Sequence, residues 1–135
     1  MSTVITFGTF DVFHYGHLRI LERARQLGDR LVVGVSSDEF SLSKKGRLPV
    51  FPQEQRIAII SALRFVDAVF LEETFELKRQ YIREQKAEVL VMGSDWKGRF
   101  DDFSDLCEVR YLERTPAVST TVVIETIRTR PHTSD

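Results

Sequence analysis

Short apolar runs alternate with amphipathic segments along almost the whole chain, and this rhythm constrains the fold more than any other feature. The strand-like runs show little polar alternation, as expected of strands covered on both faces, and they are Val4–Phe7, Leu31–Val35, Ala68–Leu71, Val89–Met92 and Val109–Leu112. Helical spacing is found in Leu18–Leu27, Gln53–Leu63, Phe75–Glu84 and Val122–Arg128. Repeated strand–helix–strand units with right-handed crossovers predict an α/β fold, a single Rossmann-like doubly wound domain with a five-stranded parallel sheet.

Length and composition set the limits of this domain. The chain has 135 residues, of which 42% are hydrophobic, enough for one core and too few for two ordinary domains. We expect one domain over residues 1–128 and a flexible C-terminal tail over 129–135, where Pro131 stands among polar residues. The formal net charge of -1 gives no global attraction to nucleic acid or to an anionic membrane, so neither is an expected partner.

The single cysteine and the N-terminus bear on the compartment. Cys107 is the one cysteine of the chain, so no intrachain disulfide can form, and we expect it to serve packing. The N-terminus carries only the short apolar run at Val4 and no segment of signal-peptide or membrane length. A cytoplasmic protein is therefore expected.

The stretch from Gly8 to His17 joins the first predicted strand to the first predicted helix. Gly8 has no side chain to keep a phosphate from the backbone, and the first N–H groups of a helix are unpaired and point outward. His14 and His17 are three residues apart, which would place both on the first helical turn, facing one ligand. The spacing alone also fits half of a metal site or two solvated residues.

Basic and polar residues follow the other predicted strands. Residues 36–49, with Lys44 among them, read as a mobile basic loop that is either solvated or able to close over a triphosphate. Residues 93–98 contain the only tryptophan and Asp95. Residues 114–121 run from Arg114 to a hydroxyl-rich segment in which Ser119 or Thr120 can cap the last helix, making a second phosphate cradle that faces the first.

The sequence Gly-Thr-Phe-Asp-Val-Phe-His-Tyr-Gly-His at residues 8–17 matches the GTFDxxHxGH form of the HxGH motif. It resembles the nucleotidyltransferase superfamily that includes the cytidylyltransferases. With the segments at residues 93–96 and 114–121, Lys44 and Lys78, nearly the whole chain is similar to the glycerol-3-phosphate cytidylyltransferase family. The resemblance implies transfer of CMP from CTP to glycerol 3-phosphate, with Mg²⁺ on the phosphates and a homodimeric enzyme.

The resemblance also implies roles for individual residues. It implies that the catalytic residues are His14, His17, Lys44 and Arg114. It implies that the nucleotide is bound by Gly8, Thr9, Phe10, Asp11, His14, Gly16, His17, Asp95, Arg114, Thr115, Ser119 and Thr120. The acceptor's phosphate would contact Lys44, Arg56 and Lys78. No protein side chain is expected as a metal ligand, because Mg²⁺ commonly keeps its waters and binds substrate phosphates.

Two departures from the family pattern bear on the substrates. The family's second motif reads RTxGISTT, whereas this chain has Ala117 in place of the glycine and Pro116 before it. The loop after Lys44 carries Gly46 and Arg47 where the family is rich in lysine. Another phosphorylated or phosphonate acceptor, ATP as donor, and a catalytically silent nucleotide-binding module therefore stay open as alternatives.

Overall fold

The computed structural model describes residues 2–116 and 118–131, and its five strands in these ranges form one parallel sheet. The strands are β1 (Thr3–Gly8), β2 (Arg30–Ser36), β3 (Ala68–Glu72), β4 (Val89–Gly93) and β5 (Glu108–Leu112). Their order is β3-β2-β1-β4-β5, and every neighbouring pair is parallel. The predicted doubly wound sheet is confirmed, with strand bounds within a residue of those expected.

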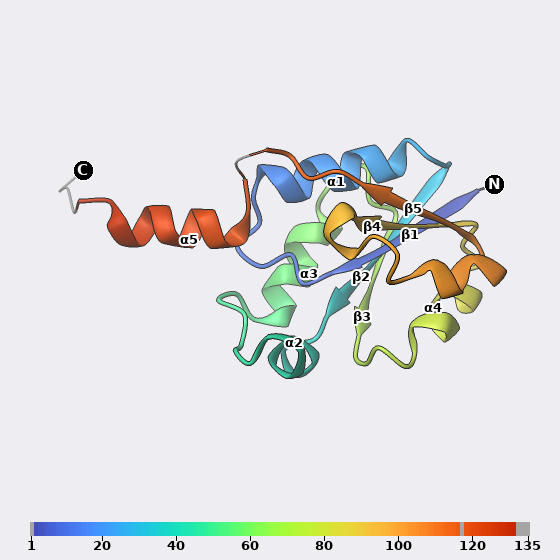
Figure 1. Cartoon of the computed structure of the whole chain (residues 1–135), viewed down its shortest axis with the longest axis horizontal. Coiled ribbons are helices and arrows are strands. Elements are labelled where there is room, and N and C mark those ends of the chain that lie inside the picture. Colours follow the sequence, from blue (N-terminus) through green and yellow to red (C-terminus); the bar gives the residue numbers. More distant parts are fainter. Residues whose placement is uncertain (1, 117, 132–135) are drawn as a thin grey trace.

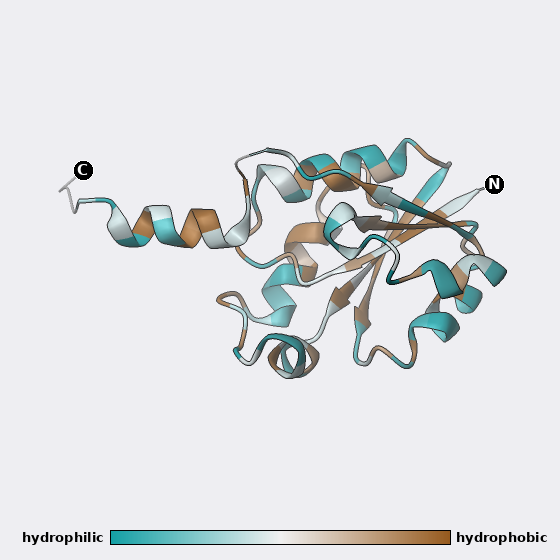
Figure 2. Ribbon diagram, in the orientation of Figure 1, coloured by the Kyte–Doolittle hydropathy of each residue, from teal (hydrophilic) through white to brown (hydrophobic). Residues whose placement is uncertain are grey.

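Helices cover both faces of this sheet (Figure 1). The helices are α1 (Tyr15–Arg25), α2 (Asp38–Lys45), α3 (Gln53–Ser61), α4 (Lys78–Glu84) and α5 (Thr120–Thr129), with short 3₁₀ turns η1 (Ser94–Trp96) and η2 (Asp101–Asp105). Apolar residues of α1 and α3 pack on one face, including Leu21 and Ile60. Ile82 of α4 and Phe103 of η2 pack on the other. Figure 2 shows hydrophobic strands in the middle of the domain and more hydrophilic helices around them.

The prediction of a mobile loop over residues 36–49 is wrong, because helix α2 occupies most of this segment. Ser37 caps its N-terminus by accepting from the Phe40 N–H at 3.0 Å, and the acidic Asp38 stands in its first turn. Its C-cap Gly46 has a φ of 74°, a left-handed conformation that glycine adopts at little cost. A short, fully capped helix therefore carries Lys44 at a fixed position.

The C-terminal helix projects from the body of the domain (Figure 1). It begins at Thr120 and ends at Thr129, so Thr129 belongs to a helix and not to the expected tail. Residues 132–135 of that tail lie outside the described part of the chain. Among the described residues, no helix has both the length and the apolar composition to cross a bilayer.

The carboxyl ends of β1 and β4, where the chain's winding reverses direction, face the base of α5 (Figure 1). Ligands of open α/β sheets bind at such a reversal. The loops that follow the strands, which contain the predicted site residues, meet at this edge.

Candidate active site

His14, at the end of the β1–α1 loop, and His17, in the first turn of α1, are held against each other by the backbone around them. The ring centroids of His14 and His17 lie 3.7 Å apart, and the ring planes differ by 21°. The Nδ1 of His14 accepts from the Gly16 N–H at 3.0 Å, and the Nδ1 of His17 accepts from the His14 N–H at 3.3 Å. The sequence predicts both histidines on the first turn of the helix. In the structure, His17 lies in that turn and His14 is the N-cap residue of α1.

These hydrogen bonds fix the proton positions on the rings. A neutral imidazole that accepts at Nδ1 carries its proton at Nε2. Burial, and then the charges of His14 and Lys45, lower the pKa of His17 to about 3, and burial and Arg114 lower the pKa of His14. At neutral pH, His14 and His17 are therefore uncharged groups with an Nε2–H to donate.

Two glycines allow the conformation of residues 8–17, which we call the histidine loop. A Cβ on Gly16 would lie 2.8 Å from the Cε1 of His14, so only glycine lets the ring sit over the helix start. A Cβ on Gly8 would lie 2.9 Å from the ring of Phe10. Phe10 itself has a φ of 54° and Val12 a φ of 48°, both in the sparsely populated left-handed region. The strained loop is fixed in place by the packing of Phe10, whose side chain is buried in the core.

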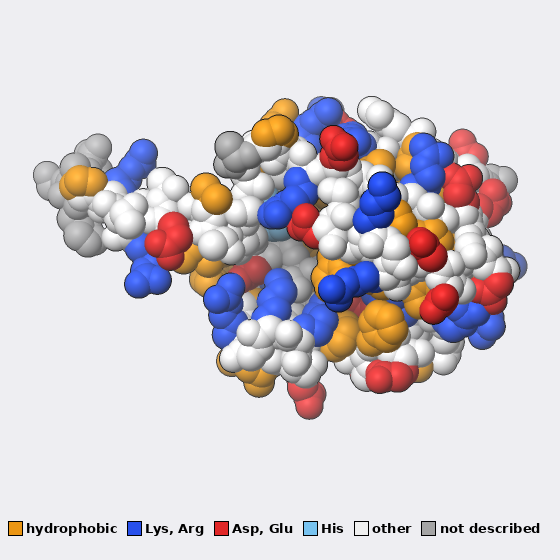
Figure 3. Space-filling view, viewed as in Figure 1, with side chains coloured by type: hydrophobic (Ala, Val, Ile, Leu, Met, Phe, Trp, Pro, Cys, Tyr) orange, Lys and Arg blue, Asp and Glu red, His pale blue; other side chains and the backbone are white. Residues whose placement is uncertain are grey.

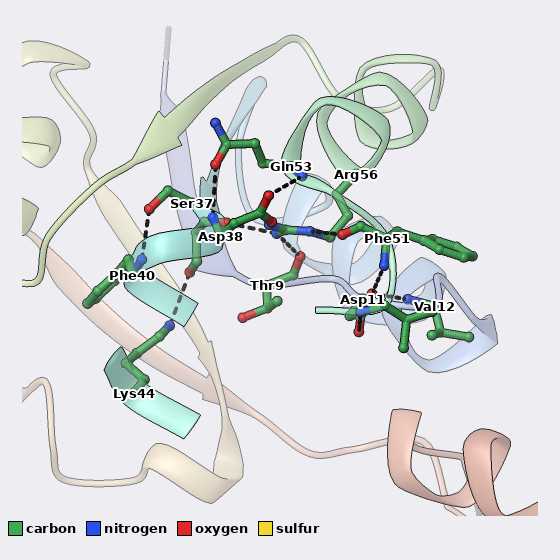
Figure 4. Close-up of polar contacts among 12 residues, drawn as sticks. Thr9, Asp11, Val12, Ser37, Asp38, Phe40, Lys44, Phe51, Gln53 and Arg56 are labelled. Atoms are coloured by element: carbon green, nitrogen blue, oxygen red, sulfur yellow. Dashed lines mark hydrogen bonds and ion pairs between the residues drawn. The ribbon is translucent and has the colours of Figure 1, made fainter. Parts of the chain in front are cut away.

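Asp11 connects the histidine loop to two other segments (Figure 4). Its carboxylate accepts from the N–H groups of Val50 at 2.7 Å and Phe51 at 2.9 Å. Its backbone carbonyl accepts from the hydroxyl of Thr120 at 3.0 Å. Asp11 lines the pocket described below, but its carboxylate is occupied by backbone donors. Asp11 thus lies at the pocket with its carboxylate holding residues 50 and 51 against the start of α1.

Arg56, which was predicted to bind the acceptor, is held by backbone carbonyls and one carboxylate. Its side chain is fully buried, with 0% exposure. The guanidinium donates to the carbonyls of Phe51 at 2.9 Å, of Thr9 and Ser36 at 2.8 Å each, and to the Asp38 carboxylate at 2.7 Å (Figure 4). Arg56 therefore holds the ends of β1 and β2 together from beneath the site.

The segment predicted to form a second phosphate cradle leads into the start of α5. Ser119 is the N-cap residue, and its hydroxyl accepts from the Val122 N–H at 3.1 Å. Arg114 forms a 3.1 Å ion pair with Asp95 of η1, and both side chains are more than half exposed. Ala117, at which the sequence departs from the family motif, lies outside the described residues.

A cavity of about 560 Å³ lies between the histidine loop, η1 and the base of α5. Its lining includes every predicted nucleotide residue, namely Gly8, Thr9, Phe10, Asp11, His14, Gly16, His17, Asp95, Arg114, Thr115, Ser119 and Thr120. Figure 3 shows a hollow beside α5 with Lys and Arg side chains at its rim. We call this cavity the nucleotide pocket.

A second cavity of about 390 Å³ adjoins the first and contains two of the predicted acceptor residues, Lys44 and Lys78. Aromatic residues form part of its wall, namely Phe7, Phe40, Phe75, Trp96 and Phe100. Burial lowers the pKa of Lys44 to about 8, against the opposing effect of Glu72, and burial also lowers the pKa of Lys78. We call this cavity the acceptor pocket, after the prediction made for its two lysines.

The two pockets share Gly8, Thr9, Lys45 and Trp96 in their linings. A ligand in one can therefore approach a ligand in the other. The sequence prediction missed Lys45, whose neighbour Lys44 matched the family, and left the role of Trp96 undecided. It also missed Glu72, although an acidic residue at the end of a buried strand is the kind of signal that marks a site.

Comparisons with known proteins agree with this geometry. The family model described as cytidylyltransferase-like matches residues 5–128. The glycerol-3-phosphate cytidylyltransferase of Bacillus subtilis (strain 168) is 49% identical over 94% of this chain and 98% of its own, and that of Staphylococcus aureus (strain NCTC 8325 / PS 47) is 43% identical over 91% and 92%. The FAD synthase of Pyrococcus abyssi is 39% identical over 68% of this chain and 62% of its own.

The fold is shared with a solved structure as well. The crystal structure of a lipopolysaccharide core biosynthesis protein from Thermoplasma volcanium GSS1 superimposes with a TM-score of 0.72 at 29% identity, covering 85% of this chain and 97% of that one. Sequence, fold and site geometry thus lead to one assignment. The chain belongs to the cytidylyltransferase-like family of nucleotidyltransferases.

Proposed function

We propose that the protein transfers CMP from CTP to glycerol 3-phosphate, giving CDP-glycerol and pyrophosphate. The observation that carries the proposal is the pair of adjoining pockets, one with two neutral histidines between helix N-termini and the other with two lysines. Relatives of 43–49% identity that cover more than nine-tenths of the chain are named glycerol-3-phosphate cytidylyltransferase, which supports the choice of substrates.

The reaction is an in-line displacement at the α-phosphorus of CTP. An oxygen of the acceptor's phosphate forms the new bond to phosphorus as the bond to the β-phosphate oxygen breaks, and pyrophosphate leaves with that electron pair. The Nε2–H groups of His14 and His17 donate to the phosphate oxygens, where negative charge accumulates in the transition state. Because both rings are already neutral and fixed by the backbone, little reorganisation accompanies the reaction.

The β- and γ-phosphates lie toward α5 in this proposal. Ser119 and Thr120 at the start of α5 line the pocket, where the first N–H groups of a helix favour an anion, and Arg114 adds a positive charge. Arg114 leaves its exposed ion pair with Asp95 at small cost, because a surface pair in water contributes little. Asp95 then becomes available to the ribose or base.

Lys44 and Lys78 receive the acceptor's phosphate. Two ammonium groups in one cavity match a phosphomonoester dianion. An acceptor with its own positive charge, such as phosphoethanolamine, would meet like charge there, which favours an uncharged body such as glycerol.

Mg²⁺ would reach the site on the nucleotide. Among the described residues, no group of three or more His, Cys, Asp or Glu side chains could hold a metal ion. The donors of the nucleotide pocket are N–H groups, hydroxyls and cations, which suit phosphate oxygens, so the phosphates and water would ligate Mg²⁺. When bound, the ion neutralises charge on the phosphates.

The test is pyrophosphate release from purified protein with Mg²⁺. CTP and ATP are each combined with a panel of phosphomonoesters, including sn-glycerol 3-phosphate, phosphoethanolamine and a sugar phosphate. The proposal expects release only with CTP and glycerol 3-phosphate. Release with another pair would keep the chemistry and change the substrates, and CTP binding without release on any pair would indicate a binding module.

A further inference from the structure

A buried carboxylate stands in the acceptor pocket between two lysines. Glu72, the last residue of β3, is 1% exposed and lies beside Ser36 of β2 in the register of the sheet. One carboxylate oxygen accepts from the Lys78 ammonium at 2.6 Å, and the other accepts from the Ser36 hydroxyl at 3.2 Å. Both oxygens are engaged, so Glu72 acts on its neighbours and not on a ligand.

The same network reaches Lys44. The Lys44 ammonium donates to the Ser36 hydroxyl oxygen at 3.1 Å. A hydroxyl has one proton, and because Ser36 gives it to Glu72, its lone pairs face Lys44. The carboxylate is therefore linked to both ammonium groups, directly to Lys78 and through Ser36 to Lys44.

Aromatic rings complete the surroundings of Lys78. Its ammonium nitrogen lies 3.8 Å from the centroid of the Phe7 ring, 5.4 Å from that of Phe100 and 5.6 Å from that of Phe75. Aromatic faces attract a cation but cannot replace water fully. A lysine with 3% exposure in such a cage needs an anion to stay protonated, and Glu72 is the anion in contact with it.

We propose that Glu72 is a positioning residue for acceptor binding, which fixes the Lys78 ammonium directly and the Lys44 ammonium through Ser36 at the places where the acceptor's phosphate binds. The inference rests on the proposed function of the acceptor pocket. A carboxylate that served only the fold would not need to be connected to both of the pocket's predicted ligands. Glu72 also contributes the negative charge of the pocket. The charged residues in the described lining are Lys44 and Lys45 on α2, Glu72 on β3 and Lys78 on α4.

The substitution Glu72→Gln tests this role, because it keeps the size of the side chain and removes its charge. KM for glycerol 3-phosphate should rise about tenfold or more, while KM for CTP changes by less than about twofold. Glu73→Gln is the matched control, because Glu73 is exposed and its side chain lies outside the acceptor pocket's lining. An equal loss for both substrates, or an unchanged KM for glycerol 3-phosphate, would overturn the proposal.

The pH profile gives a readout that a purely structural role would not change. Glu72 opposes the effect of burial on the pKa of Lys78, so its loss should let Lys78 release its proton at lower pH. The rise of the acceptor KM with pH should then begin at lower pH in Glu72→Gln than in the unaltered protein, and Glu72→Asp should return it toward the original profile. Profiles that coincide in all three proteins would contradict the proposal.

A calorimetric titration without nucleotide separates this inference from the proposed function. The unaltered protein should bind sn-glycerol 3-phosphate, Glu72→Gln should bind it about tenfold or more weakly, and thermal melting should show both folded. If Glu72→Gln does not fold, Ser36→Ala is titrated instead, because it breaks the link between Glu72 and Lys44. An affinity of Ser36→Ala equal to that of the unaltered protein overturns the proposal. If the unaltered protein binds but shows no turnover in the pyrophosphate assay, the proposed function fails while the role of Glu72 is still measured.

Discussion

The imidazoles of His14 and His17 stack 3.7 Å apart, and the backbone N–H of His14 donates to the ring of His17. The two residues therefore form one unit, in which the cap of α1 orients both rings. Each ring keeps its Nε2–H for a ligand, and neither carries charge at neutral pH because burial lowers the pKa of both. Proximity of two like groups thus concentrates hydrogen-bond donors without repulsion.

Removing one of these donors should affect turnover more than binding. His17→Ala is expected to lower kcat by about 100-fold or more, with a much smaller change in KM for CTP, because the hydrogen bond strengthens as charge accumulates in the transition state. Steady-state kinetics with varied CTP measure both constants. A variant with near-normal kcat would contradict the catalytic role of His17.

The low pKa of His17 also predicts how stability depends on pH. The folded-state pKa of about 3 lies below the ordinary value of 6.5, so His17 contributes stability that is present above pH 6.5 and is lost as pH falls toward 3. Denaturant unfolding at about pH 7.5 and about pH 4.5 should show a smaller loss in His17→Gln than in the unaltered protein. Equal losses would contradict the burial of a neutral imidazole.

Lys44 predicts a pH dependence at the other end of the range. Burial lowers its pKa to about 8, so its ammonium is lost as pH rises through that value. KM for the acceptor should therefore increase above about pH 8, and the increase should be smaller in Lys44→Arg, since a guanidinium stays charged. Initial rates with varied glycerol 3-phosphate test this, and a KM that is flat with pH in the unaltered protein would speak against the role of Lys44.

Asp11→Ala should loosen the segment at Val50 and Phe51, because two backbone N–H groups lose their acceptor. We expect a destabilisation of about 1 kcal/mol and a higher KM for CTP, since Val50 lines the nucleotide pocket. Asp11→Asn keeps one acceptor oxygen and should show about half of each effect. Kinetics with varied CTP and urea unfolding provide the measurements, and an unaltered KM in Asp11→Ala would show that the contact is dispensable.

Arg56→Lys tests whether this arginine acts on the fold or on the acceptor. An ammonium cannot reach the carbonyls of Thr9, Ser36 and Phe51 together, so the variant should lose about 3–5 kcal/mol of stability. The loss is measured by urea unfolding. If the variant is stable and only its KM for the acceptor is raised, the result would instead support the predicted contact between Arg56 and the acceptor.

The sheet was predictable because its strands are short, apolar and covered on both faces, so their sequences have little ambiguity. Helix α2 was predicted as a loop, although Ser37 at its start, Asp38 in its first turn and Gly46 at its end are ordinary cap signals. The apolar residues of α2 are too few, and the helix too short, for a helical period to be recognised in the sequence.

The site residues divide in a similar way. The predicted nucleotide residues share one cavity because the motifs follow the ends of adjacent parallel strands, a relation that topology fixes. The roles of Asp11 and Arg56 depend on burial and on backbone partners 40 and 47 residues away, which no local pattern encodes. Glu72 was missed for the same reason, because its partners Ser36 and Lys78 become neighbours only in the folded sheet.

The most direct test of the account is identification of the product. Purified protein is incubated with CTP, sn-glycerol 3-phosphate and Mg²⁺, and the nucleotide product and pyrophosphate are both quantified, by mass spectrometry and by a coupled assay. CDP-glycerol and pyrophosphate are expected in equal amounts. Pyrophosphate accompanied by CMP, or CTP left unchanged while it is bound, would contradict this expectation.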